Sequence, residues 1–167
     1  MSRDPGLRVG TGFDVHPFAD GRALVLGGVA IPHERGLAGH SDADVLLHAI
    51  CDALLGAAAL GDIGRHFPDR DPTLRGISSL ELLRRTVAIL AAAGWVPLQT
   101  DTCILAEVPR IAPHEPAMRA AIAAALGVPA ANVGIKATTT EGLGFVGRRE
   151  GIAAQAVCLI VRSAAAP

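Results

Sequence analysis

The stretch RVGTGFDVHPF, residues 8–18, is the part of the sequence that decides the fold. Its apolar beginning predicts a strand over about 8–15, and residues two apart on a strand point to the same side. Asp14 and His16 therefore share one face. A carboxylate and an imidazole placed side by side are candidate metal ligands, with a structural ion pair or hydrogen-bonded pair as the alternative.

Outward from this strand, further strands and helices alternate along the chain. Turn residues and apolar runs predict strands at 23–31, with a hairpin or bulge at Gly27–Gly28, and at 98–107, 132–138 and 152–162. Capping residues and periodicity predict helices from Ser41 or Asp42 to about Ala59, from Ser78 or Ser79 to Gly94, and over 118–127. This order predicts an α+β domain with two layers, in which one mixed sheet carries helices mainly on one face. The small residues Ala154 and Ala156 would suit a contact between subunits through the other face.

Length and composition restrict the class of protein. The 167 residues, half of them hydrophobic, suit one domain over 8–162, with a loose leader at 1–7 and a short tail at 163–167. The net charge of −1 and the scattered basic residues exclude the footprint of a nucleic-acid binder. Neither a membrane-spanning run nor a signal peptide is visible, and three cysteines without paired spacing predict buried thiols in the cytoplasm.

The helix expected after residue 41 offers a third metal ligand. Its polar positions Ser41, Asp44, His48 and Asp52 recur at helical spacing and form a stripe that lacks the long charged side chains of most solvated faces. Together with Asp14 and His16, the imidazole of His48 would complete a zinc site with an open fourth position, which is typical of catalysis. A solvated helix face is the alternative.

Two loops carry groups suited to a phosphorylated, hydroxylated ligand. KATTTEGLGFVGR, residues 136–148, offers hydroxyls and free backbone N–H groups to phosphate, and Glu141 could hold Mg²⁺ there, although a loop with a β-bulge is the alternative. In 61–76, Asp62, Asp69 and Asp71 could accept sugar hydroxyls, or belong to an ordinary acidic loop. The segment 106–113 is most simply a connection. Taken together, the candidate metal ligands and these loops predict a metal-assisted enzyme that acts on a phosphorylated, hydroxylated small molecule.

Three motifs together resemble one family over residues 8–161: GFDVHPF, HSDADVLLHAICDALLGAAALGDIGRHFPD and KATTTEGLGFVGRREGIAAQAV. They are similar to 2-C-methyl-D-erythritol 2,4-cyclodiphosphate synthases of the non-mevalonate isoprenoid pathway. The resemblance implies conversion of 4-diphosphocytidyl-2-C-methyl-D-erythritol 2-phosphate to the cyclic diphosphate with release of CMP. It also implies a homotrimer with active sites between subunits. The length leaves no room for the cytidylyltransferase domain that is fused to some relatives.

The resemblance also implies roles for individual residues. Zinc falls on Asp14, His16 and His48, a second ion, Mg²⁺ or Mn²⁺, falls on Glu141, and His40 and Thr139 stabilise the transition state. The implied substrate contacts come from several segments and are Asp14, His16, His40, Ser41, Asp62, Ile63, Gly64, Phe67, Pro68, Asp69, Arg70, Asp71, Ala106, Glu107, Val108, Pro109, Arg110, Ile111, Ala112, Thr138, Thr139, Thr140, Glu141, Phe145 and Arg148. Phe145 and Arg148 match positions near the threefold axis of the trimer, and so does Glu150. The resemblance implies a cavity at this axis that could hold an isoprenoid diphosphate. Residues 106–112 match the loop that contacts cytosine through backbone groups, and Arg110 stands where relatives often carry Lys, which keeps the charge but not the shape.

Two other functions are compatible with the same residues. A non-catalytic trimeric module could hold a nucleotide or phosphate metabolite in the Thr/Gly loop and would not need Asp14, His16 or His48. A zinc hydrolase would need a general base, for which Asp44 or Asp62 could be proposed. Release of CMP with or without the cyclic product distinguishes the three.

Overall fold

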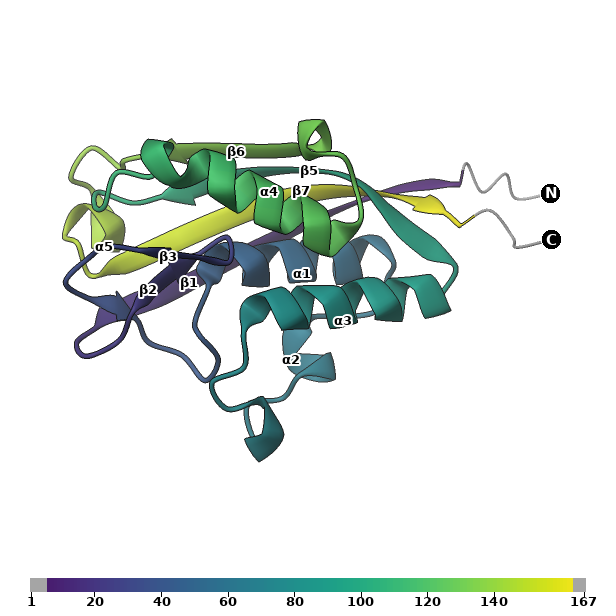
Figure 1. The fold of residues 1–167 in the computed structure, drawn as a ribbon, viewed down its shortest axis with the longest axis horizontal. Coiled ribbons are helices and arrows are strands. Elements are labelled where there is room, and N and C mark those ends of the chain that lie inside the picture. Colours follow the sequence, from purple (N-terminus) through teal and green to yellow (C-terminus); the bar gives the residue numbers. More distant parts are fainter. Residues whose placement is uncertain (1–5, 164–167) are drawn as a thin grey trace.

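The computed structural model describes residues 6–163 and is built on a five-stranded sheet (Figure 1). The strands are ordered β4–β1–β7–β5–β6. Their bounds are β1 Leu7–Ala19, β4 Gly36–Leu37, β5 Trp95–Leu105, β6 Val133–Thr138 and β7 Gly151–Arg162. β5 and β6 are parallel and the other pairs are antiparallel, which confirms the mixed sheet.

The expected hairpin at Gly27–Gly28 is present as a separate two-stranded ribbon, β2 (Leu24–Leu26) and β3 (Val29–Ile31). Both glycines of the turn have positive φ, 58° and 77°, as a tight two-residue turn requires. Their N–H groups point toward the start of the first helix and donate hydrogen bonds to Asp44 there.

Helices cover one face of the sheet, as expected (Figure 1). The long ones are α1 (Val45–Ala57), α3 (Ser79–Ala92) and α4 (Glu115–Leu126). Two single-turn helices, α2 (Ile63–His66) and α5 (Gly144–Gly147), lie in segments expected to be loops, and 3₁₀ turns occur at Pro72–Leu74, Ala112–His114 and Ala130–Asn132. α4 begins three residues earlier than expected, because Pro116 occupies its first turn, where a missing N–H costs nothing.

The hydrophobic core lies between α1 and the two long strands β1 and β7. In β7, Ala154, Ala156 and Cys158 are fully buried, and the Cys158 Sγ lies 4.0 Å from the Ile50 carbonyl oxygen of α1. The expectation that Ala154 and Ala156 form a subunit contact is therefore wrong. Their small side chains face α1 and let the helix come close to the sheet.

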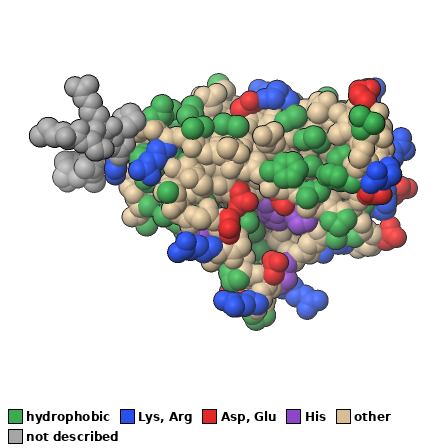
Figure 2. Space-filling view, turned by 180° about the vertical axis from the view of Figure 1, so that it is seen from behind, with side chains coloured by type: hydrophobic (Ala, Val, Ile, Leu, Met, Phe, Trp, Pro, Cys, Tyr) green, Lys and Arg blue, Asp and Glu red, His purple; other side chains and the backbone are tan. Residues whose placement is uncertain are grey.

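The opposite face of the sheet is left uncovered by the described helices. Five apolar side chains of the two central strands are exposed there by between 40% and 62%, and they are Leu7, Val9, Phe13, Val15 and Val157. Figure 2, which views the molecule from the side opposite to Figure 1, shows hydrophobic side chains spread over this side with histidines beneath them. An apolar face of this extent is unusual for a monomer.

The remaining expectations concern the termini, the cysteines and membranes. Leu7 already belongs to β1, and residues 1–5 and 164–167 of the expected leader and tail lie outside the described residues. Cys51 and Cys158 are buried as expected, whereas Cys103 is only half-buried because it lies on the open face of β5. No helix within residues 6–163 has the length and apolar composition needed to cross a membrane.

Candidate metal centre

The site begins where β1 passes the first half of α1. Residues 10, 12, 14 and 16 all point to the helical side of β1, because side chains alternate along a strand. The first two are glycines, and α1 lies directly against them. The next two, Asp14 and His16, extend their side chains beside the helix, where His48 on α1 meets them. The prediction that these three residues lie together is confirmed.

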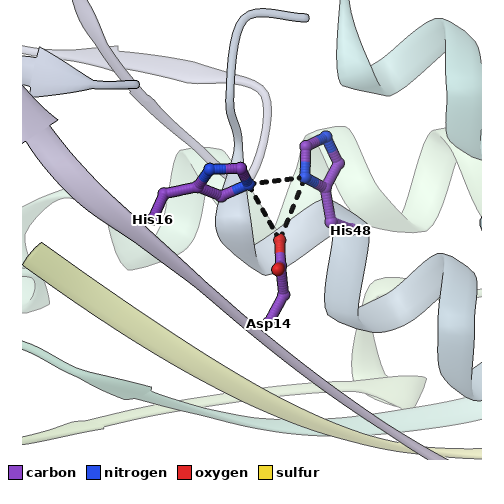
Figure 3. Close-up of side chains that lie close together, drawn as sticks. All are labelled: Asp14, His16 and His48. Atoms are coloured by element: carbon purple, nitrogen blue, oxygen red, sulfur yellow. Dashed lines mark hydrogen bonds and ion pairs between the residues drawn. The ribbon is translucent and has the colours of Figure 1, made fainter. Parts of the chain in front are cut away.

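The three side chains form a nearly equilateral triangle of ligand atoms (Figure 3). The Asp14 Oδ2 atom lies 3.0 Å from His16 Nε2 and 3.0 Å from His48 Nδ1, and the two nitrogens are 3.1 Å apart. All three side chains are largely buried, with exposures of 27%, 18% and 12%.

The donor set and its geometry fit a tetrahedral metal ion. Ligand atoms about 2.0–2.1 Å from zinc lie about 3.3–3.4 Å from one another, close to the observed triangle. The His16 Nδ1 lies 2.6 Å from the Ala38 carbonyl oxygen, which only accepts hydrogen bonds, so Nδ1 carries the hydrogen and Nε2 presents its lone pair. The lone pairs of the carboxylate and the imidazoles repel one another when no cation lies between them. The triad is therefore suited to bind a metal cation.

Without a bound cation, electrostatics within the triad favour the charged forms of two groups, and a metal ion that binds would displace the proton from His16 Nε2. Burial opposes ionisation of Asp14, but hydrogen bonds and charges from His16 and His48 outweigh it and hold the pKa of that carboxyl far below 3.8. Burial likewise lowers the pKa of His16, but the bond and charge of Asp14 outweigh it and raise that pKa above 6.5. The negative charge of Asp14 is thus kept, as a metal ligand requires.

The first helix begins later than the sequence predicts. Its N-cap is Asp44 rather than Ser41 or Asp42, and Ala43 before it adopts a φ of 58°. The reason is tertiary. The buried Asp44 carboxylate accepts N–H bonds from Leu47, at 3.1 Å, and from the hairpin residues Gly27 and Gly28, at 3.0 and 2.7 Å. Ser41 and Asp44 are therefore not on the helical stripe, and Asp44 does not face the site.

Burial raises the pKa of Asp44 to about 6, while its three N–H donors act in the opposite direction. Its carboxyl is accordingly committed to structure. It ties the hairpin to the end of the helix that carries His48, and it is not available as the general base that a hydrolase would need.

We expect Asp44→Ala to lower the free energy of unfolding by about 3 kcal/mol, because two buried N–H groups and one half-buried N–H group lose their acceptor and the helix loses its cap. Urea titration followed by circular dichroism measures this loss. Asp20→Ala, at an exposed turn position, is the matched control and should change it by less than about 0.5 kcal/mol. Equal stability of the two variants would contradict the role given to Asp44.

A cavity of about 260 Å³ opens beside the triad. It is lined by the expected metal ligand His48 and, of the residues expected to bind substrate, by Asp14, His16, His40, Ser41, Ile63, Gly64, Phe67 and Asp69. Asp52, from the predicted stripe, also lines it, and its carboxylate accepts the Ile63 N–H at 2.7 Å, which holds α2 against α1. Burial raises the pKa of Asp52.

A second group of expected residues gathers at the end of the sheet where β5 and β6 finish. The Glu107 carboxylate accepts N–H bonds from Thr140, at 3.0 Å, and Gly142, at 3.3 Å, so the 106–112 segment and the Thr/Gly loop are joined. Glu141 is exposed, and its carboxylate accepts the Thr139 hydroxyl at 3.0 Å. These residues do not line the cavity of the triad within the described chain.

Other expected residues use their side chains locally. The carboxylates of Asp62 and Asp71 accept N–H bonds from Arg65 and Thr73, each at 2.9 Å, and cap short turns. Arg148 pairs with Glu150 at 2.8 Å, which raises the pKa of the guanidinium and lowers that of the carboxyl. Phe145 lines a separate apolar hollow with Phe13 and Leu105.

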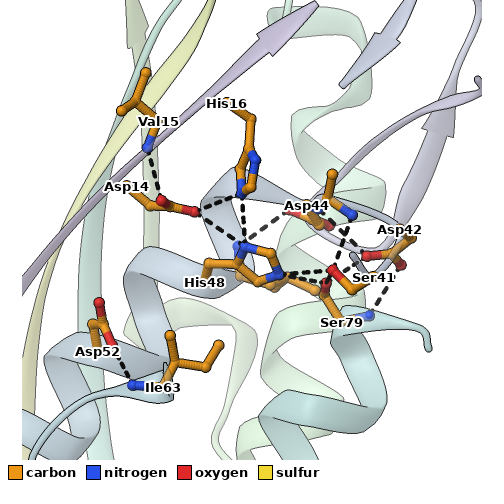
Figure 4. A network of polar contacts seen from close by, with 12 residues as sticks. Asp14, Val15, His16, Ser41, Asp42, Asp44, His48, Asp52, Ile63 and Ser79 are labelled. Atoms are coloured by element: carbon orange, nitrogen blue, oxygen red, sulfur yellow. Dashed lines mark hydrogen bonds and ion pairs between the residues drawn. The ribbon is translucent and has the colours of Figure 1, made fainter. Parts of the chain in front are cut away.

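Sequence reasoning missed two residues at the site, Asp42 and Ser79. The sequence marks both only as possible helix caps. They lie 37 positions apart and meet behind His48 (Figure 4), and no local pattern marks that contact.

Comparison with known proteins gives consistent matches. The model of the YgbB family matches residues 7–161. The chain is 61% identical to the 2-C-methyl-D-erythritol 2,4-cyclodiphosphate synthase of Syntrophobacter fumaroxidans over 92% of this chain and 97% of that protein, and 60% identical to that of Burkholderia thailandensis over 96% and 99%. A solved structure of such a synthase in a CDP-bound form has a TM-score of 0.84 and 37% identity, covering 92% of this chain and 99% of that one.

Proposed function

The chain belongs to the YgbB family, and we infer that it catalyses the reaction of a 2-C-methyl-D-erythritol 2,4-cyclodiphosphate synthase, a lyase of isoprenoid precursor biosynthesis. The observation that carries this function at the level of geometry is the triad. A carboxylate oxygen and an imidazole lone pair fixed by Ala38 converge with His48 at the edge of a cavity that also holds His40 and Ser41.

Asp14, His16 and His48 are the residues that would hold Zn²⁺. The ion, when bound, supplies Lewis-acid polarisation of a phosphate oxygen. Glu141 would hold the second ion, Mg²⁺ or Mn²⁺, whose charge offsets that of the diphosphate. A single carboxylate beside threonine hydroxyls fits Mg²⁺ because this ion is usually bound by one or two carboxylates together with substrate phosphates.

In the reaction, an oxygen of the 2-phosphate forms a bond to the β-phosphorus of the cytidine diphosphate group, and the bond from that phosphorus to CMP breaks. Such a transfer depends on positioning and charge more than on covalent catalysis. His40 and Ser41 position the attacking phosphate. The Ser41 Oγ accepts the Ala43 N–H at 3.0 Å, which leaves its own hydrogen to donate to the phosphate. Thr139 acts with His40 in stabilising the transition state.

The remaining contacts divide by segment. Asp62 to Gly64 and Phe67 to Asp71 surround the methylerythritol and ribose, Thr138 to Thr140 contact phosphates, and 106–112 binds cytosine through backbone groups. The last two segments are joined by Glu107 but line no cavity with the triad inside the described chain. This separation supports an active site shared between adjacent subunits of a homotrimer. Phe145 and Arg148 would then face an axial cavity suited to an isoprenoid diphosphate.

We expect Val157→Asp to convert the trimer to monomers, because it places a charge in the middle of the uncovered sheet face. Light scattering after size-exclusion chromatography measures the mass. Ala91→Asp, at an exposed position of α3 on the helical side, is the matched control and should remain a trimer. A Val157→Asp protein that still forms trimers would contradict assembly through this face.

The proposed activity is tested by incubating the protein with the cytidine diphosphate substrate, Zn²⁺ and Mg²⁺ and by quantifying CMP and the cyclic diphosphate separately. Equal amounts of both are expected. CMP without the cyclic product would favour the hydrolase, and no turnover would favour the binding module. We place the activity in the cytoplasm, where three unpaired cysteines would remain reduced.

A further inference from the structure

The two ring nitrogens of His48 face different surroundings (Figure 4). Nδ1 points into the triad, 3.0 Å from Asp14 Oδ2. Nε2 points away from it and lies 3.0 Å from the Ser79 Oγ and 3.1 Å from the Ser41 Oγ. Which nitrogen carries the hydrogen decides whether Nδ1 can bind a metal, because only the unprotonated nitrogen is a ligand.

The partners of Ser79 fix the direction of its own hydrogen bond with His48. Ser79 is completely buried in the first turn of α3, where its hydroxyl donates to Asp42 Oδ1 and its backbone N–H donates to Asp42 Oδ2 at 3.0 Å. A serine hydroxyl has one hydrogen, and a carboxylate only accepts. With that hydrogen given to Asp42, the Ser79 Oγ can only accept from His48. Ser79 thus favours the tautomer with hydrogen on Nε2, in which Nδ1 keeps its lone pair, and it acts against Asp14 Oδ2, which can accept from Nδ1 at 3.0 Å.

We propose that Asp42 and Ser79 are positioning residues for the metal centre, which hold His48 in the Nε2–H tautomer so that Nδ1 is available as a ligand. The inference rests on the proposed metal site at Asp14, His16 and His48. Neither residue touches the metal or the substrate.

The two histidines of the triad are oriented by different kinds of group. His16 donates to a backbone carbonyl, that of Ala38, which no substitution of a side chain removes. His48 depends on a chain of two side chains, and the same chain ties the loop that carries His40 and Ser41 to α3. Backbone bonds from Asp42 to Ile77, at 3.1 Å, and from Gly76 to His40, at 2.9 Å, run beside it. Metal affinity and loop position are thus set by the same residues.

Asp42→Asn is the sharpest test because it is isosteric. The Ser79 backbone N–H can only donate, so the amide oxygen of the new side chain must face it, and the NH₂ group then faces the Ser79 hydroxyl. This reverses the hydroxyl, which now donates to His48 Nε2 and favours hydrogen on Nδ1. We expect the zinc affinity to fall about 100-fold, the upper end of the usual effect of groups that orient metal ligands. Competition with a chromogenic chelator measures it.

Ser79→Ala removes the hydroxyl that accepts from His48 Nε2 but puts no donor in its place. The Ser41 Oγ, 3.1 Å from Nε2, remains as an acceptor. The expected loss of zinc affinity is therefore smaller, about 10-fold. Ser78→Ala is the matched control. Ser78 is the neighbouring residue, is exposed and makes no side-chain capping bond, so its removal should leave the affinity unchanged.

Long-range ¹H–¹⁵N correlation spectra of the histidine rings show which ring nitrogen of His48 carries the hydrogen. Substitutions that only destabilised the fold would leave this tautomer unchanged. The wild type should show hydrogen on Nε2 of His48, and Asp42→Asn should show it on Nδ1. An unchanged tautomer together with wild-type affinity in Asp42→Asn would overturn the proposal. If that variant does not fold, wild-type affinity in Ser79→Ala would do the same. A wild-type protein that binds no zinc would instead refute the proposed metal site.

Discussion

A His48→Ala protein is expected to lose stoichiometric zinc and at least about 10³-fold in kcat/KM for CMP release, because it keeps only two of the three ligands and loses the stabilisation of charge in the transition state. Its fold should persist, because position 48 lies inside α1 and alanine has the highest helix propensity of all residues. Metal analysis of the purified protein and a CMP assay measure the two losses together.

His33→Ala is the matched control, because its imidazole hydrogen-bonds the backbone of Arg35 and stacks on Phe18, outside the metal centre. It should retain zinc and activity. If His48→Ala turned over substrate at the wild-type rate, neither the synthase mechanism with zinc nor a zinc hydrolase could stand. If it lost zinc but kept full activity, the metal would be dispensable for the reaction.

The architecture and the shared face of Asp14 and His16 could be predicted from the sequence because both follow from local periodicity, whereas the place of His48 beside them was implied by the resemblance to the family. Asp14 and His16 share a face by the alternation of a strand, and the turn at Gly27–Gly28 has its own signature. The start of α1 could not be predicted, because the hairpin, 16 and 17 residues earlier in the chain, supplies the N–H groups that make Asp44 the cap. A tertiary contact selected among three acceptable capping residues.

The same limit explains the other errors. Alternation in β7 shows that Ala154 and Ala156 share a face, but not whether that face meets a helix or another subunit. The pairing of Asp42 with Ser79 joins two segments that are each marked only as helix starts. What the sequence leaves open in each case is the identity of the neighbour, which only the packing of α1 and α3 on the sheet decides.

The two glycines that precede the triad on β1 connect this packing to the chemistry. A Cβ atom at Gly12 would lie 2.0 Å from the Ala49 carbonyl oxygen and 2.7 Å from the Ala53 nitrogen, both in the backbone of α1. Gly10 is equally close to the backbone around Ala53. The helix that carries His48 therefore rests on the bare backbone of the strand that carries Asp14 and His16, and the size of residue 12 sets the distance between the ligands.

We accordingly expect Gly12→Ala to lower the free energy of unfolding by about 3 kcal/mol, because backbone atoms cannot move aside as the end of a flexible side chain can. Where the protein still folds, α1 must shift away from β1, and the separation of His48 Nδ1 from Asp14 grows. A misplacement of about 1 Å is enough to lower activity about 10²-fold, so bound zinc and CMP release should fall with stability. Chemical unfolding and metal analysis at 25 °C measure both.

Gly56→Ala separates this effect from the general cost of replacing glycine at the interface. Gly56 lies on α1 itself, is exposed, and a Cβ there would meet only the Thr11 carbonyl oxygen at 3.9 Å. Because alanine favours a helix over glycine by up to about 1 kcal/mol, this variant should be slightly more stable than the wild type and keep its zinc. A Gly12→Ala protein as stable and as metal-rich as Gly56→Ala would show that the contact between strand and helix does not set the geometry of the site.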